Sequence, residues 1–213
     1  MGESVAPVAA VLLAAGEGSR MGSRPKSLLQ IDGQPLITRL LRACLDAGIE
    51  ELVVVLGHYA DQISPAIGDL PARLVINPNP EAGLVSSQRL GLAALSGSAD
   101  ANLMALADQP LLVASDLTDL LAFWRVNRAG VDAVYPQVEG QRGNPVVISA
   151  AARDEILADG EQVGCRDWQR KHPNRTMPFV TSNEHFRVDL DTEADVARLR
   201  ATTGWSVCWP SDG

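Results

Sequence analysis

The sequence predicts an α/β protein built on a doubly wound, mostly parallel sheet, and three observations support this class. Apolar, strand-like runs alternate along the chain with segments of helical periodicity. The first run, Val8–Leu13, is apolar without polar alternation, as expected of a strand covered by helices on both faces. A loop with Gly16, Gly18 and Gly22 follows it directly. Because such sheets bind ligands beyond the carboxyl ends of their strands, we expect a binding site at this loop.

Residues 1–136 are expected to form the larger part of one domain. A helix over Pro35–Ala47 is predicted because leucine and alanine recur at helical spacing and Gly48 follows the segment. The predicted strands are Val8–Leu13, Glu51–Leu56, Arg73–Ile76, Asn102–Ala107 and Asp132–Pro136. The predicted helices are Pro35–Ala47, Tyr59–Ile67, Leu84–Leu95 and Ala114–Asn127. Asp108, which follows the fourth strand, should therefore lie at the same rim of the sheet as the glycine loop.

The sequence pattern of residues 137–203 predicts a smaller lobe of the same domain, made of a β-hairpin and helices. The hairpin is expected at 137–149, because Glu139-Gly140 and Gly143 supply turn chemistry. The later elements are expected to be helices at Ala150–Leu157, Gly164–Lys171 and Glu193–Ala201 and strands at Met177–Thr181 and Arg187–Leu190. Residues 204–213 form a tail outside this pattern, and its Trp205 and Trp209 leave open whether it docks or frays.

Composition narrows the function classes. The 213 residues contain 18 Lys plus Arg against 26 Asp plus Glu, a formal net charge of −8, which argues against a nucleic-acid-binding protein. Three widely spaced cysteines without a Cys-x-x-Cys pair suggest neither a disulfide framework nor a zinc site. The first residues lack a basic region, and no run approaches the ~20 apolar residues of a membrane helix. We therefore expect a cytoplasmic protein without a membrane partner; its oligomeric state is not predicted.

The glycine loop differs from two well-known phosphate-binding loops. A P-loop requires Gly-Lys, whereas Lys26 follows Pro25. A dinucleotide fingerprint requires a third glycine where Met21 stands, and an acid where the second strand ends in Gly57-His58. Glycines nevertheless let backbone amides approach an anion, and nearby cations neutralise it. A nucleoside triphosphate is the candidate anion.

Residues 13–22 (LAAGEGSRMG), followed by Pro25-Lys26, resemble the opening loop of the MobA-like nucleotidyltransferase family. Further motifs agree in the family's order: Asn77–Leu95, Asp108-Gln109-Pro110, Gly143–Val146, Gly164–Arg166 and Asp189–Thr192. The resemblance covers roughly residues 8–200 and is greatest to the molybdenum cofactor cytidylyltransferases. It implies a Rossmann-like nucleotidyltransferase fold, with residues 1–136 on the nucleotide side and 137–203 on the acceptor side.

The activity that this resemblance implies is Mg²⁺-dependent transfer of a nucleoside monophosphate from a triphosphate to a phosphorylated acceptor, with release of pyrophosphate. Ala15, in the middle of Ala-Ala-Gly, resembles the cytidylyl branch, because glycine is commoner there in the guanylyl branch. CTP and a molybdopterin-type acceptor follow from that resemblance. A sugar- or polyol-phosphate nucleotidyltransferase, or a catalytically silent nucleotide sensor or carrier, remain alternatives.

Candidate nucleotide contacts come from the loop and from the start of a later helix. Arg20 is a predicted pyrophosphate clamp, because a guanidinium donates two parallel hydrogen bonds to phosphate oxygens. Lys26 is predicted at the α-phosphate, where an ammonium stabilises developing charge. The full predicted set is Ala14, Ala15, Gly16, Gly18, Arg20, Lys26, Gly83 and Ser86. The competing interpretation makes these residues turn glycines, solvated cations and an N-terminal helix cap.

Two aspartates are candidate Mg²⁺ ligands, because Mg²⁺ binds one or two carboxylates together with phosphate oxygens. Asp108 is also placed among the catalytic residues with Arg20 and Lys26, although aspartate equally initiates turns. Asp191 is the second predicted ligand by resemblance, although it lies next to a capping box and could simply stabilise the following helix. Asn144 is the predicted acceptor contact, although a hairpin turn would use the same residue.

Overall fold

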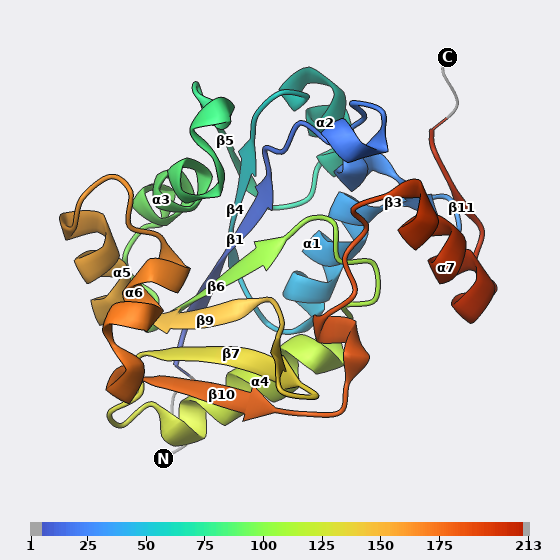
Figure 1. Ribbon diagram of the computed structural model, residues 1–213. Helices are drawn as coiled ribbons and strands as arrows, with labels where there is room; N and C mark the ends of the chain where they lie inside the picture. The colour runs from blue at the N-terminus through green and yellow to red at the C-terminus, as the bar shows by residue number, and fades with distance from the viewer. Residues whose placement is uncertain (1–5, 211–213) are drawn as a thin grey trace.

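A mixed eight-stranded sheet forms the centre of the computed structural model, which describes residues 6–210 (Figure 1). Its strands are β1 (Val8–Ala14), β4 (Glu51–Leu56), β5 (Arg73–Ile76), β6 (Ala101–Leu106), β7 (Ala133–Val138), β8 (Gln141–Arg142), β9 (Val146–Ser149) and β10 (Thr176–Val180). Seven of them follow the order β10-β7-β9-β6-β1-β4-β5, and β8 pairs with β7 as a hairpin. The predicted α/β class and the Rossmann-like arrangement are confirmed.

The strand order creates a ligand-binding position at one rim of the sheet. Strand β1 pairs in parallel with β4 on one side and with β6 on the other. The chain moves outward from β1 to β4 and β5 and then returns to β6, so connections leave β1 and β6 in opposite directions. Beyond the carboxyl ends of two such strands a crevice opens. Strand β9 runs antiparallel to β6 and β7, and β8 runs antiparallel to β7, whereas all other strand pairs of the sheet are parallel.

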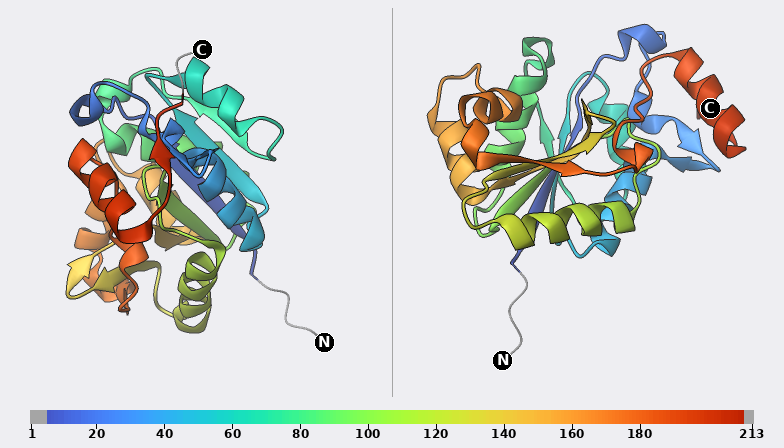
Figure 2. Two further views of the ribbon diagram at one scale, coloured as in Figure 1. Left: turned by 90° about the vertical axis from the view of Figure 1, so that its right-hand side faces the viewer. Right: turned by 60° about the horizontal axis from the view of Figure 1, so that its bottom comes forward.

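Helices cover both faces of the sheet, because β1 is apolar on both. The helices are α1 (Leu36–Asp46), α2 (Ala60–Ile67), α3 (Leu84–Ala94), α4 (Ala114–Asn127), α5 (Ala150–Ala158), α6 (Cys165–Lys171) and α7 (Glu193–Thr203). Ala10 and Leu12 of β1 belong to a core shared with α1, α2 and α4. Val11 and Leu13, which alternate with them along the strand, belong to a core shared with α3, α5 and α6. The two groups of helices lie on opposite faces of the sheet (Figures 1 and 2). Short 3₁₀ turns are η1 (Ser19–Met21), η2 (Lys26–Leu28), η3 (Pro80–Ala82), η4 (Pro173–Arg175) and η5 (Glu184–Phe186).

A third, smaller core ties the glycine loop to the end of the chain. A three-stranded sheet of β2 (Gln30–Ile31), β3 (Gln34–Pro35) and β11 (Val207–Cys208) lies beside α7 (Figure 1). Met21 of the glycine loop is 1% exposed and packs in this core with Leu190 and with Val196 and Leu199 of α7. The loop is therefore held by buried apolar contacts on one side of the rim.

Most predicted elements are confirmed, and the differences have local causes. Glu51–Leu56, Arg73–Ile76 and Ala114–Asn127 match their predicted bounds. The strand predicted over Arg187–Leu190 is wrong: Leu190 donates its amide to the carbonyl of Asp108 at 3.0 Å, instead of to a strand. In the tail, whose behaviour the sequence left open, β11 pairs with β2.

Residues 1–5 and 211–213 lie outside the described residues, and with them the start of the chain and the last part of the predicted tail. Within residues 6–210, no helix combines the length and apolar character needed to cross a membrane.

Replacing Gly91 by alanine should destabilise the fold. An added Cβ on α3 would overlap Val11 Cγ1 of β1 and lie 2.9 Å from Val55 Cγ2 of β4. Overpacking of this kind costs about 1–3 kcal/mol, which exceeds the ~1 kcal/mol that alanine adds in helix propensity. Urea denaturation should show a lower midpoint for Gly91→Ala. The matched control is Gly160→Ala, where a Cβ would meet nothing within 4 Å; an unchanged midpoint for Gly91→Ala would contradict the packing described.

Candidate active site

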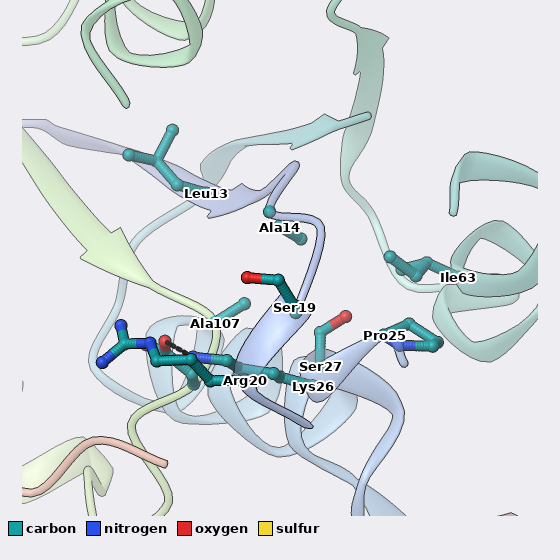
Figure 3. Close-up of a pocket in the computed structure, with 12 residues that line it drawn as sticks. Leu13, Ala14, Ser19, Arg20, Pro25, Lys26, Ser27, Ile63 and Ala107 are labelled. Atoms are coloured by element: carbon teal, nitrogen blue, oxygen red, sulfur yellow. Dashed lines mark ion pairs between the residues drawn. The ribbon is translucent and has the colours of Figure 1, made fainter. Parts of the chain in front are cut away.

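A cavity of about 160 Å³ lies at the rim where β1 and β6 end (Figure 3). Its walls come from the ends of both strands, from the glycine loop and from the turn η2. Predicted residues that line it are Ala14, Gly16, Gly18, Arg20, Lys26 and Asp108. The ends of β1 and β6 and the glycine loop thus lie around one cavity, as predicted from the sequence.

Gly18 and the residues around it fix the shape of the loop. Gly18 has φ 65°, and a Cβ on it would overlap the carbonyl oxygen of Arg24, so glycine alone fits there. The Gly18 carbonyl accepts hydrogen bonds from the amides of Met21 at 2.8 Å and Ser23 at 3.1 Å. Tyr59 donates its hydroxyl to the carbonyl of Glu17 at 2.9 Å. The loop is therefore an ordered wall of the cavity.

Lys26 brings together three segments that are far apart in the sequence. Its ammonium donates a hydrogen bond of 2.5 Å to Asp191 Oδ1 and lies 3.6 Å from Asp108 Oδ2 (Figure 3 shows the Lys26–Asp108 pair). Arg20 contacts the other oxygen of Asp191 at 2.9 Å. The side chain of Lys26 is 18% exposed, whereas that of Arg20 is 67% exposed. Lys26 is thus a fixed cation, and Arg20 is an accessible one.

Burial and neighbouring charges shift the pKa values of the carboxyl groups in opposite directions. Burial raises the pKa of Asp108, and Asp189 and Asp191 raise it further, while Lys26 lowers it. Burial and the charge of Asp191 raise the pKa of Asp189. The hydrogen bond from Lys26 lowers the pKa of Asp191. Three carboxyl groups, those of Asp108, Asp189 and Asp191, therefore lie near only two cations, Lys26 and Arg20. This carboxylate cluster favours the binding of an additional positive charge.

The residues fit a divalent cation that shares its ligands with phosphate. Oδ1 of Asp108 is buried and has no hydrogen-bond partner. Asp108 Oδ2 and Asp191 Oδ1 lie 3.6 Å and 2.5 Å from the same ammonium, so oxygens of both carboxylates lie close to one point. Within residues 6–210, no group of three or more His, Cys, Asp or Glu side chains could hold a metal by itself. Two carboxylates suffice for Mg²⁺ when phosphate oxygens and water complete its ligands.

Several predicted residues lie outside this cavity. Ala15 packs its carbonyl and Cβ against Gly57, which has no room for a side chain. Gly83 precedes α3, and Ser86 accepts a hydrogen bond from Asn77 at 3.0 Å and lines a separate cavity of about 630 Å³. Asn144 uses its backbone: its amide donates to Phe186 and its carbonyl accepts from Gln109. The structure therefore groups Lys26 and the glycine-loop residues with both aspartates, but not with Gly83, Ser86 or Asn144.

Other residues of the cavity were not singled out from the sequence. Ser19 and Ser27 line it, and Ser27 is 5% exposed. Gln109 does not line the cavity but directly follows Asp108; it is 5% exposed and donates to the carbonyls of Asn144 at 3.3 Å and Phe186 at 3.4 Å. Each of these residues is the sequence neighbour of a predicted site residue (Arg20, Lys26 or Asp108), and this proximity is the sequence signal that could have identified it.

Comparison with protein families finds a match over residues 10–176 to the MobA-like NTP transferase domain. The nicotine blue oxidoreductase of Paenarthrobacter nicotinovorans is 33% identical over 205 residues, which cover 93% of this chain and 100% of that protein. The bifunctional protein GlmU of Sorangium cellulosum is 32% identical over 168 residues, 76% of this chain. The matched region spans 34% of that GlmU, about a third of its length.

A solved structure with the same fold is a nucleotidyl transferase from Methanothermobacter. The TM-score is 0.74 with 24% sequence identity, and the match covers 92% of this chain and 97% of that one. At this identity the likeness concerns the fold.

Asp108→Asn should stabilise the protein at neutral pH. The folded pKa of Asp108 lies above its unfolded value of about 3.9. Its ionisation is therefore less favourable in the folded state, and the associated stability is lost as pH rises through the folded pKa. Urea denaturation should show the variant gaining stability over the wild type from pH 4 to pH 7. The exposed Asp154→Asn is the control; a variant less stable than the wild type at pH 7 would contradict the sign of the shift.

Proposed function

Because the chain belongs to the MobA-like NTP transferase family, we propose that it is a divalent-metal-dependent nucleotidyltransferase. It transfers a nucleoside monophosphate from a triphosphate, with CTP favoured, to a phosphorylated acceptor of molybdopterin type and releases pyrophosphate. The observation that carries the proposal is the Lys26 ammonium, which lies beneath the glycine loop and contacts Asp191 while facing Asp108.

Lys26 and Arg20 have different tasks in this proposal. Lys26 is mostly buried and held by Asp191, so its charge is already in position when the α-phosphate gains negative charge in the transition state. Arg20 is exposed, and its guanidinium can leave Asp191 and take two oxygens of the departing pyrophosphate. Backbone amides around Gly16 and Gly18 bind the remaining phosphate oxygens. Positioning and charge neutralisation account for the catalysis, and no covalent enzyme intermediate is required.

Asp108 and Asp191 are the proposed ligands of Mg²⁺. Bound there, the cation supplies Lewis-acid polarisation and neutralises phosphate charge. The unpartnered Oδ1 of Asp108 and the raised pKa of this carboxyl group support the assignment, because both indicate a carboxylate that lacks positive charge. Lys26, which lies between the two carboxylates, orients both towards the phosphates.

The remaining predicted contacts lie further from the phosphates. Ala15 in the Ala-Ala-Gly string favours CTP. Gly83 and Ser86 follow β5, and we assign them to the base and ribose. Asn144 is assigned to the acceptor. A sugar- or polyol-phosphate acceptor is the alternative within the same chemistry, and a silent nucleotide sensor or carrier is the alternative outside it.

A second candidate function is reduction with a nicotinamide cofactor. It is favoured by the relative named nicotine blue oxidoreductase, which matches over its whole length. A dinucleotide-binding β-strand of this kind ends in an acid that binds the ribose, whereas β4 is followed by Gly57-His58. Hydride transfer also needs no pair of carboxylates around a buried lysine. The nucleotidyltransferase proposal therefore explains more of the site.

Substrate binding and turnover separate these functions. Titration calorimetry with Mg²⁺ should show CTP binding at least about tenfold more tightly than GTP or UTP. Pyrophosphate should then be released with molybdopterin and not with sugar or polyol phosphates. Tight CTP binding without pyrophosphate release from any of these acceptors would favour the sensor. Oxidation of NADPH, with displacement of CTP by NADPH, would favour the reductase.

Lys26→Ala should lower kcat by roughly 10²–10³-fold while changing the Kd of the nucleotide much less, because its charge serves the transition state. The sequence contains one other lysine, Lys171, which supplies a matched control. Lys171 is 53% exposed on α6 and pairs with Asp159 at 2.7 Å. Steady-state pyrophosphate release should be unchanged in Lys171→Ala; an unchanged kcat in Lys26→Ala would remove Lys26 from the catalytic residues.

A further inference from the structure

A cavity of about 760 Å³ lies next to the rim, between the loop after β6, residues 182–189 and α7. We call it the α7 cavity. Small-molecule sites span about 300–1,000 Å³, so the α7 cavity has a suitable size, whereas the 160 Å³ rim cavity has no room for a triphosphate and an acceptor together. Asp189 lines the α7 cavity. It lies two residues before Asp191, whose carboxylate accepts a hydrogen bond from Lys26 of the rim cavity, so the segment 189–191 extends from one cavity towards the other.

One side chain of the α7 cavity is held in a defined orientation. His185 Nδ1 lies 2.8 Å from Oδ2 of Asp116, whose side chain is 6% exposed. The same carboxylate accepts hydrogen bonds from the amide of Val113 at 3.0 Å and from Nδ2 of Asn183 at 2.7 Å. Because a carboxylate only accepts hydrogen bonds, the His185 proton lies on Nδ1. Nε2 is then a free acceptor in the neutral ring, and the side chain is 40% exposed.

The walls around His185 combine apolar and polar surface. Leu111, Val113 and Trp205 provide apolar area, and Val113 is 38% exposed. Arg187 and Arg198 add cations, and Glu184, Asp189 and Asp195 add carboxylates. A polyol phosphate would leave the apolar walls without a contact. A ring system with polar edges would cover them and also reach Nε2 of His185.

We propose that the α7 cavity binds the ring of a ring-bearing phosphomonoester acceptor, and that His185 selects this ring by accepting a hydrogen bond at Nε2. Asp116 is the positioning residue that fixes the tautomer and orientation of His185. The inference rests on the proposed function in one respect, namely that the acceptor's phosphate lies at the carboxylate cluster. Neither His185 nor Asp116 belongs to the phosphate-binding residues described above.

Nuclear magnetic resonance of the histidine side chains tests the binding without turnover. The full chain is loaded with Mg²⁺ and cytidine 5′-[α,β-methylene]triphosphate, and two phosphomonoesters are added in turn. 6-Hydroxymethylpterin phosphate carries a ring, and glycerol 3-phosphate does not. The pterin probe should shift the His185 resonances, and glycerol 3-phosphate should leave them unchanged. His172, which stacks on Trp168 at 4.4 Å between ring centroids, is the internal control and should not shift.

Nitrogen chemical shifts of His185 report its tautomer. They should show a proton on Nδ1 in the wild type and lose this signature in Asp116→Asn. His185 resonances that do not respond to saturating pterin phosphate would overturn the proposal.

Variants of His185 add an affinity measurement. His185→Ala should weaken pterin phosphate binding roughly five- to tenfold, the effect of one neutral hydrogen bond, and His185→Gln should restore part of it. Nucleotide affinity should stay unchanged in both variants, and His172→Ala is the matched control. Equal probe affinity in wild type and His185→Ala would refute the role of His185.

The outcomes also distinguish this inference from the proposed function. A shift of His185 without pyrophosphate release from any acceptor would leave the α7 cavity as a ligand site and remove the transferase. Pyrophosphate release with an unchanged acceptor KM in His185→Ala would retain the transferase and remove the α7 cavity.

Discussion

The contact between the Lys26 ammonium and the carboxylates of Asp191 and Asp108 is the interaction on which the site depends. It joins the glycine loop, the end of β6 and the segment before α7, and Lys26 and Asp191 are 165 residues apart in the sequence. The sheet topology makes this possible, because β1 and β6 are neighbours whose connections leave in opposite directions. Three carboxyl groups near two cations leave a local deficit of positive charge. This shortage of positive charge destabilises the free protein and favours the binding of a dication.

Apolar packing keeps this charged cluster in place. Met21 lies within the glycine loop, yet it is buried in the third core with Leu190. Leu190 in turn lies between the two acidic residues Asp189 and Asp191. The same core includes α7 and Val207 of the docked tail. Residues beyond the family match, which ends at residue 176, thus pack against the glycine loop.

The sequence predicted those helices and strands correctly that are long enough to show a hydrophobic pattern. It did not predict the elements whose structure depends on tertiary contacts. The bounds predicted for the helix Ala114–Asn127 and for the apolar strand Glu51–Leu56 are correct. Strands β2, β3 and β11 have two residues each and carry no periodicity. The pattern of Arg187–Leu190 predicts a strand. In the structure Leu190 instead donates its amide to the carbonyl of Asp108 and packs its side chain in the third core.

For the site, the glycine loop and Asp108 were predicted from strand ends, whereas Asp191 came from the family resemblance. No sequence pattern linked His185 to Asp116, because 69 residues separate them. The most direct test of the account is a crystal structure with CTP and Mn²⁺, in which anomalous scattering locates the metal. The account predicts a manganese peak in contact with Asp108 and Asp191, and Lys26 Nζ at the α-phosphate. A peak away from both aspartates, or a triphosphate that lies far from Lys26, would contradict it.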